Sequence, residues 1–206
     1  MIADLCLVLL LDASGSVDAA EWELQAKATA DAISNPAIVD KITHGQHGRI
    51  VVTAMEWSGA AVTMLPWTPI ASMGDAKSVA LVLATYQRRQ SGSTALGDAL
   101  MAAAAAIKAA PDCTRHVVDV SSDGTSNAGV NPAQAVATLQ AMDVQVNALV
   151  IQDEIGVLEF YEKTVSGFVM PASWESYQQA IKAKLSLEIA EVDPCRPHQA
   201  FCGTIQ

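Results

Sequence analysis

The chain has 206 residues, of which 51% are hydrophobic and 17% are charged. This length and composition fit one compact globular domain with a sizeable core and argue against intrinsic disorder. The formal net charge of -10 argues against nucleic acid or an anionic membrane as a partner. No apolar stretch approaches the ~20 residues that a membrane-spanning helix requires. The apolar run near the start lacks the basic leader and cleavage site of a signal peptide.

Short apolar runs alternate with helical patterns along nearly the whole chain. The predicted strands are residues 5–11, 50–57, 61–65, 115–121, 144–151 and 167–169. Helices are predicted at 18–34, 75–88, 96–109, from 132, at 157–164 and at 173–189. The tight turn at Ser58-Gly59 makes the short strand at 61–65 an antiparallel edge strand.

This order predicts an α/β fold, a Rossmann-like doubly wound and mostly parallel sheet with helices on both faces. We expect residues 1–190 to form one domain and 191–206 to form a C-terminal tail.

Oxygen-bearing side chains gather where the first predicted strand ends. Asp12, Ser14 and Ser16 directly follow the apolar run at 5–11. The carboxyl ends of parallel strands are where open α/β sheets bind ligands, and small oxygen ligands suit a hard divalent cation. The same residue types also suit an ordinary strand-to-helix turn. This motif by itself leaves both interpretations open.

Two later loops carry further oxygen ligands. Thr94 lies between two predicted helices, and Asp123 follows the strand at 115–121. If the first and fourth strands are neighbours, Asp12 and Asp123 project from the same edge of the sheet. An ordinary turn requires neither Thr94 nor Asp123, so these residues favour a metal site.

In this order, the five residues resemble the metal-ion-dependent adhesion site (MIDAS) of von Willebrand factor type A (VWA) domains. The agreement in the order of elements extends over residues 3–189. The chain looks most like a set of uncharacterised bacterial VWA proteins, which usually carry a secretion signal. The features that carry this likeness are the Asp-x-Ser-Gly-Ser-Val opening, Glu56-Trp57 and Ser93-Thr94-Ala95.

The resemblance implies a role for each residue. Ser14 and Ser16 would bind the metal directly, and Thr94 would bind it directly or through water. Asp12 and Asp123 would hold metal-bound waters and orient the serines. Mg²⁺ is the expected ion, with Mn²⁺ or Ca²⁺ as substitutes.

A coordination position would remain for an Asp or Glu carboxylate of a protein partner. The resemblance therefore implies a non-enzymatic, metal-dependent protein-binding module. One alternative is a non-catalytic subunit of an ATPase or metal-chelatase complex. Another is a structural protein whose metal stiffens three loops.

A serine hydrolase would require a histidine base beside Ser14. The loop that holds His44 and His47 precedes the second strand, His116 opens the fourth, and His198 is in the tail. None of these positions is at the end of the sheet where Ser14 is expected, and the chain has no Gly-x-Ser-x-Gly elbow. The sequence therefore argues against serine catalysis.

Asp119 interrupts a strand that is otherwise apolar. A carboxylate in such a place requires an ionic partner or hydrogen bonds. Arg49 and Arg115 are the candidate partners, and the sequence does not distinguish between them.

The four cysteines provide information on the cellular compartment of the protein. Cys6 is expected to be a small buried hydrophobic residue inside the first strand. A disulfide is expected to tether the tail, either between Cys195 and Cys202 or from one of them to Cys113. Such a bond would favour an extracytoplasmic location, periplasmic or secreted, over the cytoplasmic alternative.

Overall fold

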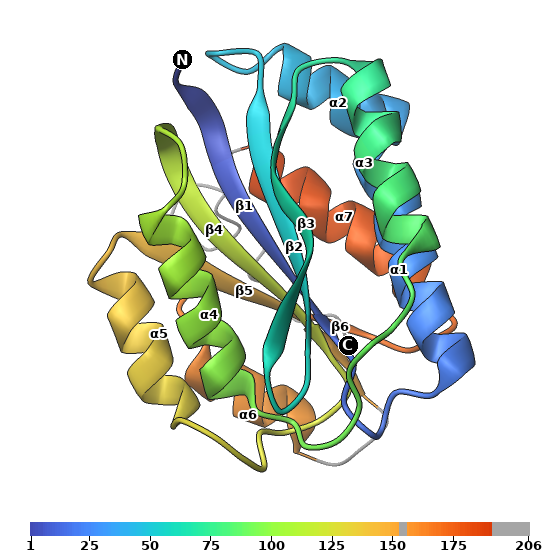
Figure 1. The fold of residues 1–206 in the computed structure, drawn as a ribbon, viewed down its shortest axis with the longest axis vertical. Coiled ribbons are helices and arrows are strands. Elements are labelled where there is room, and N and C mark those ends of the chain that lie inside the picture. Colours follow the sequence, from blue (N-terminus) through green and yellow to red (C-terminus); the bar gives the residue numbers. More distant parts are fainter. Residues whose placement is uncertain (153–155, 191–206) are drawn as a thin grey trace, which may run out of the picture.

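The computed structural model of the protein describes residues 1–152 and 156–190. A six-stranded sheet crosses the molecule in the order β3-β2-β1-β4-β5-β6 (Figure 1). β3 is antiparallel to β2, and the other pairings are parallel. The strands are β1 (Ala3–Asp12), β2 (Ile50–Trp57), β3 (Ala61–Ile70), β4 (Cys113–Ser122), β5 (Val144–Ile151) and β6 (Val169–Ala172).

Helices cover both faces of this sheet (Figure 1). One face packs against α1 (Ala19–Ile33), α2 (Pro36–Thr43), α3 (Met73–Thr85) and α7 (Tyr177–Ile189). The other packs against α4 (Leu96–Lys108), α5 (Pro132–Gln140) and α6 (Val157–Thr164). The predicted fold class is confirmed.

The central strand β1 explains the apolar run at the start of the chain. Leu7 and Leu9 face one hydrophobic core, whereas Val8 and Leu10 face the other. A strand covered on both faces must be apolar at successive positions. Because β1 pairs with β4, the loops that follow these two strands leave the sheet side by side.

The predicted start of α1 is confirmed by a capping box. The Asp18 carboxylate accepts hydrogen bonds from the backbone N–H groups of Ala20 and Glu21 at 2.7 and 2.8 Å. The Glu21 carboxylate in turn accepts one from the Asp18 N–H at 2.7 Å. These bonds satisfy N–H groups that have no partner inside the helix.

Asn35 and Pro36, directly after the predicted helix at 18–34, begin a further helix that was not predicted. The Asn35 side chain accepts a hydrogen bond from the Ala37 N–H at 3.1 Å, and Pro36 occupies the first turn of α2. Proline lacks an N–H group that would be unpaired there, so it starts a helix as readily as it stops one.

The two edge strands differ in extent from their predictions. β3 has 10 residues and continues beyond position 65 through Pro66 and Pro69. β6 begins at Val169 instead of ending there, and it contains Pro171. Proline is tolerated at the edge of a sheet because one side of the strand has no ladder partner. Prolines therefore do not mark the ends of these two strands.

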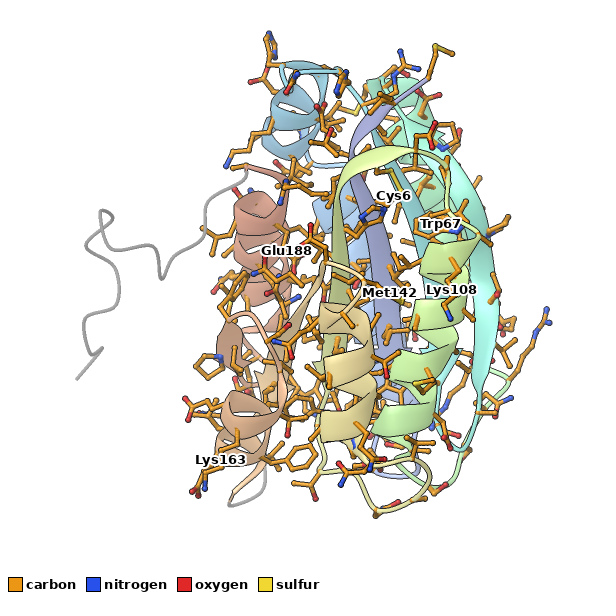
Figure 2. The ribbon with its side chains drawn as sticks, turned by 90° about the vertical axis from the view of Figure 1, so that its left-hand side faces the viewer. Cys6, Trp67, Lys108, Met142, Lys163 and Glu188 are labelled. Carbon is orange, nitrogen blue, oxygen red and sulfur yellow. A yellow bond between two sulfur atoms is a disulfide. The ribbon has the colours of Figure 1, made fainter. Side chains whose placement is uncertain are left out.

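The partner of Asp119 is neither of the predicted arginines. On the face covered by α7, the Lys184 ammonium forms a fully buried ion pair with the Asp119 carboxylate. Lys184 also pairs with Glu188 at 2.8 Å, and the Asn147 side chain donates to the same Glu188 carboxylate at 2.9 Å. Glu188 is labelled on α7 in Figure 2. Burial raises the pKa of Glu188 to about 8, and the nearby negative charge of Asp119 contributes to the same shift.

A disulfide joins Cys6 on β1 to Cys113 on β4 (Figure 2). Cys6 is buried inside β1 as predicted, but it belongs to a disulfide and is not simply a hydrophobic residue. The alternative in which Cys113 pairs with the tail is wrong. The two strands are neighbours, and their pairing brings the two Cα atoms to 5.6 Å. Cys195, Cys202 and the rest of the predicted tail lie outside the described residues.

Replacing Lys184 with methionine should lower the free energy of unfolding by about 3–5 kcal/mol, because it leaves the buried Asp119 without its cation. Lys182 is exposed on the same helix, so Lys182→Met should change stability by no more than about 0.5 kcal/mol. Urea denaturation of both variants measures the difference. Equal stability of the two variants would show that Lys184 does not neutralise a buried charge.

Removing the disulfide by Cys113→Ser should lower the free energy of unfolding by about 2–5 kcal/mol, since the bond closes a long loop in the unfolded chain. Urea denaturation measures the loss. Alkylation of the denatured, unreduced protein followed by mass analysis of its peptides provides the control. Alkylated Cys6 in the wild type would contradict the pairing.

Candidate metal centre

The carboxylate of Asp12 lies at the ends of two neighbouring strands. Asp12 is the last residue of β1 and is fully buried. Its Oδ1 accepts a hydrogen bond from the Ser14 N–H at 2.7 Å, and its Oδ2 accepts one from the hydroxyl of Ser122, the last residue of β4. Burial raises the pKa of Asp12 to about 6, although hydrogen bonds from Ser122 and Ser14 act in the opposite direction.

Two serine hydroxyls continue the cluster toward solvent. The Oγ atoms of Ser14 and Ser16 lie 3.2 Å apart, and the Ser16 hydroxyl donates to Asp123 Oδ1 at 2.7 Å. Ser14 and Asp123 are buried, whereas Ser16 is exposed. The cluster therefore opens to solvent at Ser16.

Thr94 reaches the same place from the loop between α3 and α4. Its N–H donates to Asn127 Oδ1 at 2.9 Å, and its carbonyl accepts the Asn127 N–H at 2.9 Å. A Cβ atom on Gly124 would lie 3.8 Å from Ser16 Oγ and 3.9 Å from Thr94 Oγ1, so both hydroxyls border this glycine. The structure thus brings together the side chains of Asp12, Ser14, Ser16, Thr94 and Asp123.

The chemistry of this donor set fits a hard divalent cation. Every side chain in the cluster offers oxygen, from hydroxyls and from two carboxylates. The charge of Asp123 contributes to the raised pKa of Asp12, and a cation between two such carboxylates would relieve their repulsion. Within residues 1–152 and 156–190, no three His, Cys, Asp or Glu side chains form a metal-binding group. A zinc site built from three such side chains is therefore not found in the described structure.

The described histidines lie far from Ser14, at the amino ends of the strands. The His47 N–H donates to the Asp4 carboxylate near the start of β1, and His44 caps the end of α2. His116 pairs in register with Cys6 early in β1. His198 is outside the described residues. Within the described residues, no histidine is therefore placed to act as a base for Ser14.

Three residues that bind to the cluster were not predicted from the sequence. The Gln25 side chain donates to the Asp12 carbonyl at 2.9 Å, and the Tyr161 hydroxyl donates to the Gly124 carbonyl at 3.3 Å. The third, Ser122, binds Asp12 directly. Only Ser122 had a local signal, because it directly precedes Asp123. Gln25 and Tyr161 come from α1 and α6, whose orientation depends on the folded structure.

A family model described as a protein of unknown function (DUF1194) matches residues 2–193. The chain belongs to the DUF1194 family. A search of curated proteins gives no match for this DUF1194 chain.

Solved structures identify the fold. Proximal thread matrix protein 1 from the mussel byssus superposes with a TM-score of 0.72 at 18% identity, over 91% of this chain and 48% of the mussel chain. The DUF1194 chain therefore spans about half the length of that protein. A second structure of the mussel protein has a zinc-occupied MIDAS motif.

Two bacterial structures have the same fold. A conserved hypothetical protein, BatB, from Bacteroides thetaiotaomicron gives a TM-score of 0.63 at 18% identity, over 91% of this chain and 99% of BatB. A von Willebrand factor type A protein from Catenulispora acidiphila gives a TM-score of 0.65 at 14% identity, over 91% of this chain and 43% of that protein. The DUF1194 chain thus has the VWA fold. Its helices, within the described residues, are all too short or too polar to cross a bilayer.

In the absence of metal, Asp12→Asn should stabilise the protein at neutral pH. The pKa of Asp12 is raised from 3.8 to about 6 on folding, so the stability associated with its protonated form is lost as pH rises through 6. Asparagine does not titrate, so the variant should gain about 1–3 kcal/mol at about pH 8 and little at about pH 4.

Urea denaturation in the presence of EDTA measures this gain. Asp112→Asn, at an exposed position, is the matched control. A gain in the free energy of unfolding that does not depend on pH would show that ionisation of Asp12 is not its cause.

Proposed function

We propose that this DUF1194 protein is a metal-dependent protein-binding module that recognises a carboxylate of its partner. The observation that carries the proposal is the cluster of hydroxyl and carboxylate oxygens from three loops, which is open to solvent at Ser16. The VWA fold supports it, and so does the zinc-occupied MIDAS motif of the mussel protein, which has the same fold.

Each residue has a distinct role in this proposal. Ser14 and Ser16 bind the cation through their hydroxyls, and Thr94 binds directly or through water. Asp12 and Asp123 hold metal-bound waters and orient the serines. Neutral ligands leave most of the positive charge on the ion, which then offers a Lewis-acidic position to a carboxylate oxygen. Mg²⁺ is the proposed ion, with Mn²⁺ or Ca²⁺ as substitutes.

The Cys6–Cys113 disulfide supports an extracytoplasmic location, periplasmic or secreted, because such bonds persist in oxidising compartments. It favours the binding module over a subunit of a cytosolic ATPase or chelatase complex. We further propose that residues 1–190 form the binding domain, that 191–206 form a separate tail, and that the protein has no catalytic activity of its own.

Isothermal titration with Mn²⁺ and Mg²⁺ tests the metal site. The wild type should bind one ion, and Asp12→Ala and Thr94→Ala should each weaken binding about tenfold or more. Ser93→Ala is a matched control, since Ser93 is the exposed neighbour of Thr94 and has no proposed metal contact. Equal affinity of the wild type and Asp12→Ala would exclude the proposed site.

Recognition of a carboxylate can be measured separately with Mn²⁺-loaded protein. Acetyl-aspartate amide should displace a metal-bound water and lower the relaxation rate of water protons, whereas the asparagine analogue should not. If the metal binds but neither compound changes relaxation, the metal has a structural role that stiffens the three loops.

A further inference from the structure

Arg88 connects two of the loops that form the candidate metal centre. It lies in the 86–92 segment, which leads from α3 toward Thr94. Its Nη2 donates to the carbonyl oxygens of Ala13 and Ser14, both at 2.7 Å. Its Nη1 donates to the Val17 carbonyl, also at 2.7 Å. The 12–17 loop therefore has three of its carbonyl groups directed at one guanidinium.

These bonds constrain the shape of the loop. A guanidinium is planar and presents its N–H groups in fixed directions, so three carbonyls that bind it at once are fixed relative to one another. The loop between them carries Ser14 and Ser16. Hydroxyl ligands are neutral, so their affinity for a cation depends strongly on how well they are positioned before it binds.

Arg88 is itself fixed by a buried carboxylate. Glu56, on β2, is fully buried and accepts hydrogen bonds from the Tyr86 hydroxyl at 3.1 Å and from the Arg89 N–H at 2.9 Å. The residues on both sides of Arg88 are thus attached to the sheet. The Gly92 carbonyl adds a direct connection between the loops, because it accepts the Gly15 N–H at 2.8 Å.

We infer that Arg88 is a positioning residue, which holds the 12–17 loop in the shape required for metal binding without touching the metal. The inference rests on the proposed function. It differs from a purely electrostatic role, in which the positive charge of Arg88 would repel a nearby cation.

The test uses Arg88→Lys and Arg88→Gln, with Arg89→Gln as the matched control. Arg89 is the neighbouring, exposed arginine, and its guanidinium lies over the Tyr86 ring. Titration with Mn²⁺ gives the affinity, hydrogen–deuterium exchange in EDTA gives the protection of amides 13–17, and thermal unfolding gives the overall stability.

Both Arg88 variants should bind Mn²⁺ about tenfold more weakly or worse, and their amides at 13–17 should exchange faster at temperatures where the protein is folded. Arg89→Gln should match the wild type in both measurements. Arg88→Lys keeps the positive charge, so weaker binding by this variant cannot be attributed to loss of charge.

Three results would overturn the inference. If both Arg88 variants bind Mn²⁺ with wild-type affinity, the inference is overturned, although the proposed metal site is not. Tighter binding by Arg88→Gln with unchanged binding by Arg88→Lys would identify a charge effect instead. Absence of Mn²⁺ binding by the wild type would overturn the proposed function, and this inference with it.

Discussion

The buried carboxylate of Asp12 is the constraint around which the candidate metal centre is built. A carboxylate at the end of a central strand loses its hydration, and its raised pKa reports that loss. Hydrogen bonds from Ser14 and Ser122 stabilise it in part, and they also fix the ends of β1 and β4 relative to each other. A divalent cation beside this carboxylate would supply the missing positive charge. A carboxylate that destabilises the metal-free protein is therefore well suited to lie near a cation.

The two ends of the sheet are stabilised by different interactions. At the amino ends, a disulfide joins β1 to β4, and the Asp4 carboxylate holds the loop before β2 through the His47 N–H. At the carboxyl ends, hydrogen bonds among short polar side chains and backbone groups connect the loops. Such bonds are individually weak and can rearrange. The fold thus combines a rigid scaffold with loops that bear the candidate ligands.

Features that depend on residues close together in the chain could be predicted from the sequence. β2, β5 and α6 begin and end where periodicity placed them, and the five candidate ligands could be named because short motifs carry them. What was missed depends on which distant residues meet. The Cys6–Cys113 bond spans 107 positions, and Lys184 was indistinguishable from a solvent-exposed lysine until α7 was placed on the sheet. Arg88 binds only backbone carbonyls in its contacts with the 12–17 loop, and these leave no trace in the sequence.

The position of the disulfide in the chain also governs the order in which cysteines can pair during synthesis. Cys6 precedes Cys113 and must remain a thiol until Cys113 has followed it, 107 positions later. Both then become available before Cys195 and Cys202 have been translated. An oxidant that acts on the chain during co-translational export would therefore meet Cys6 and Cys113 before the last two cysteines.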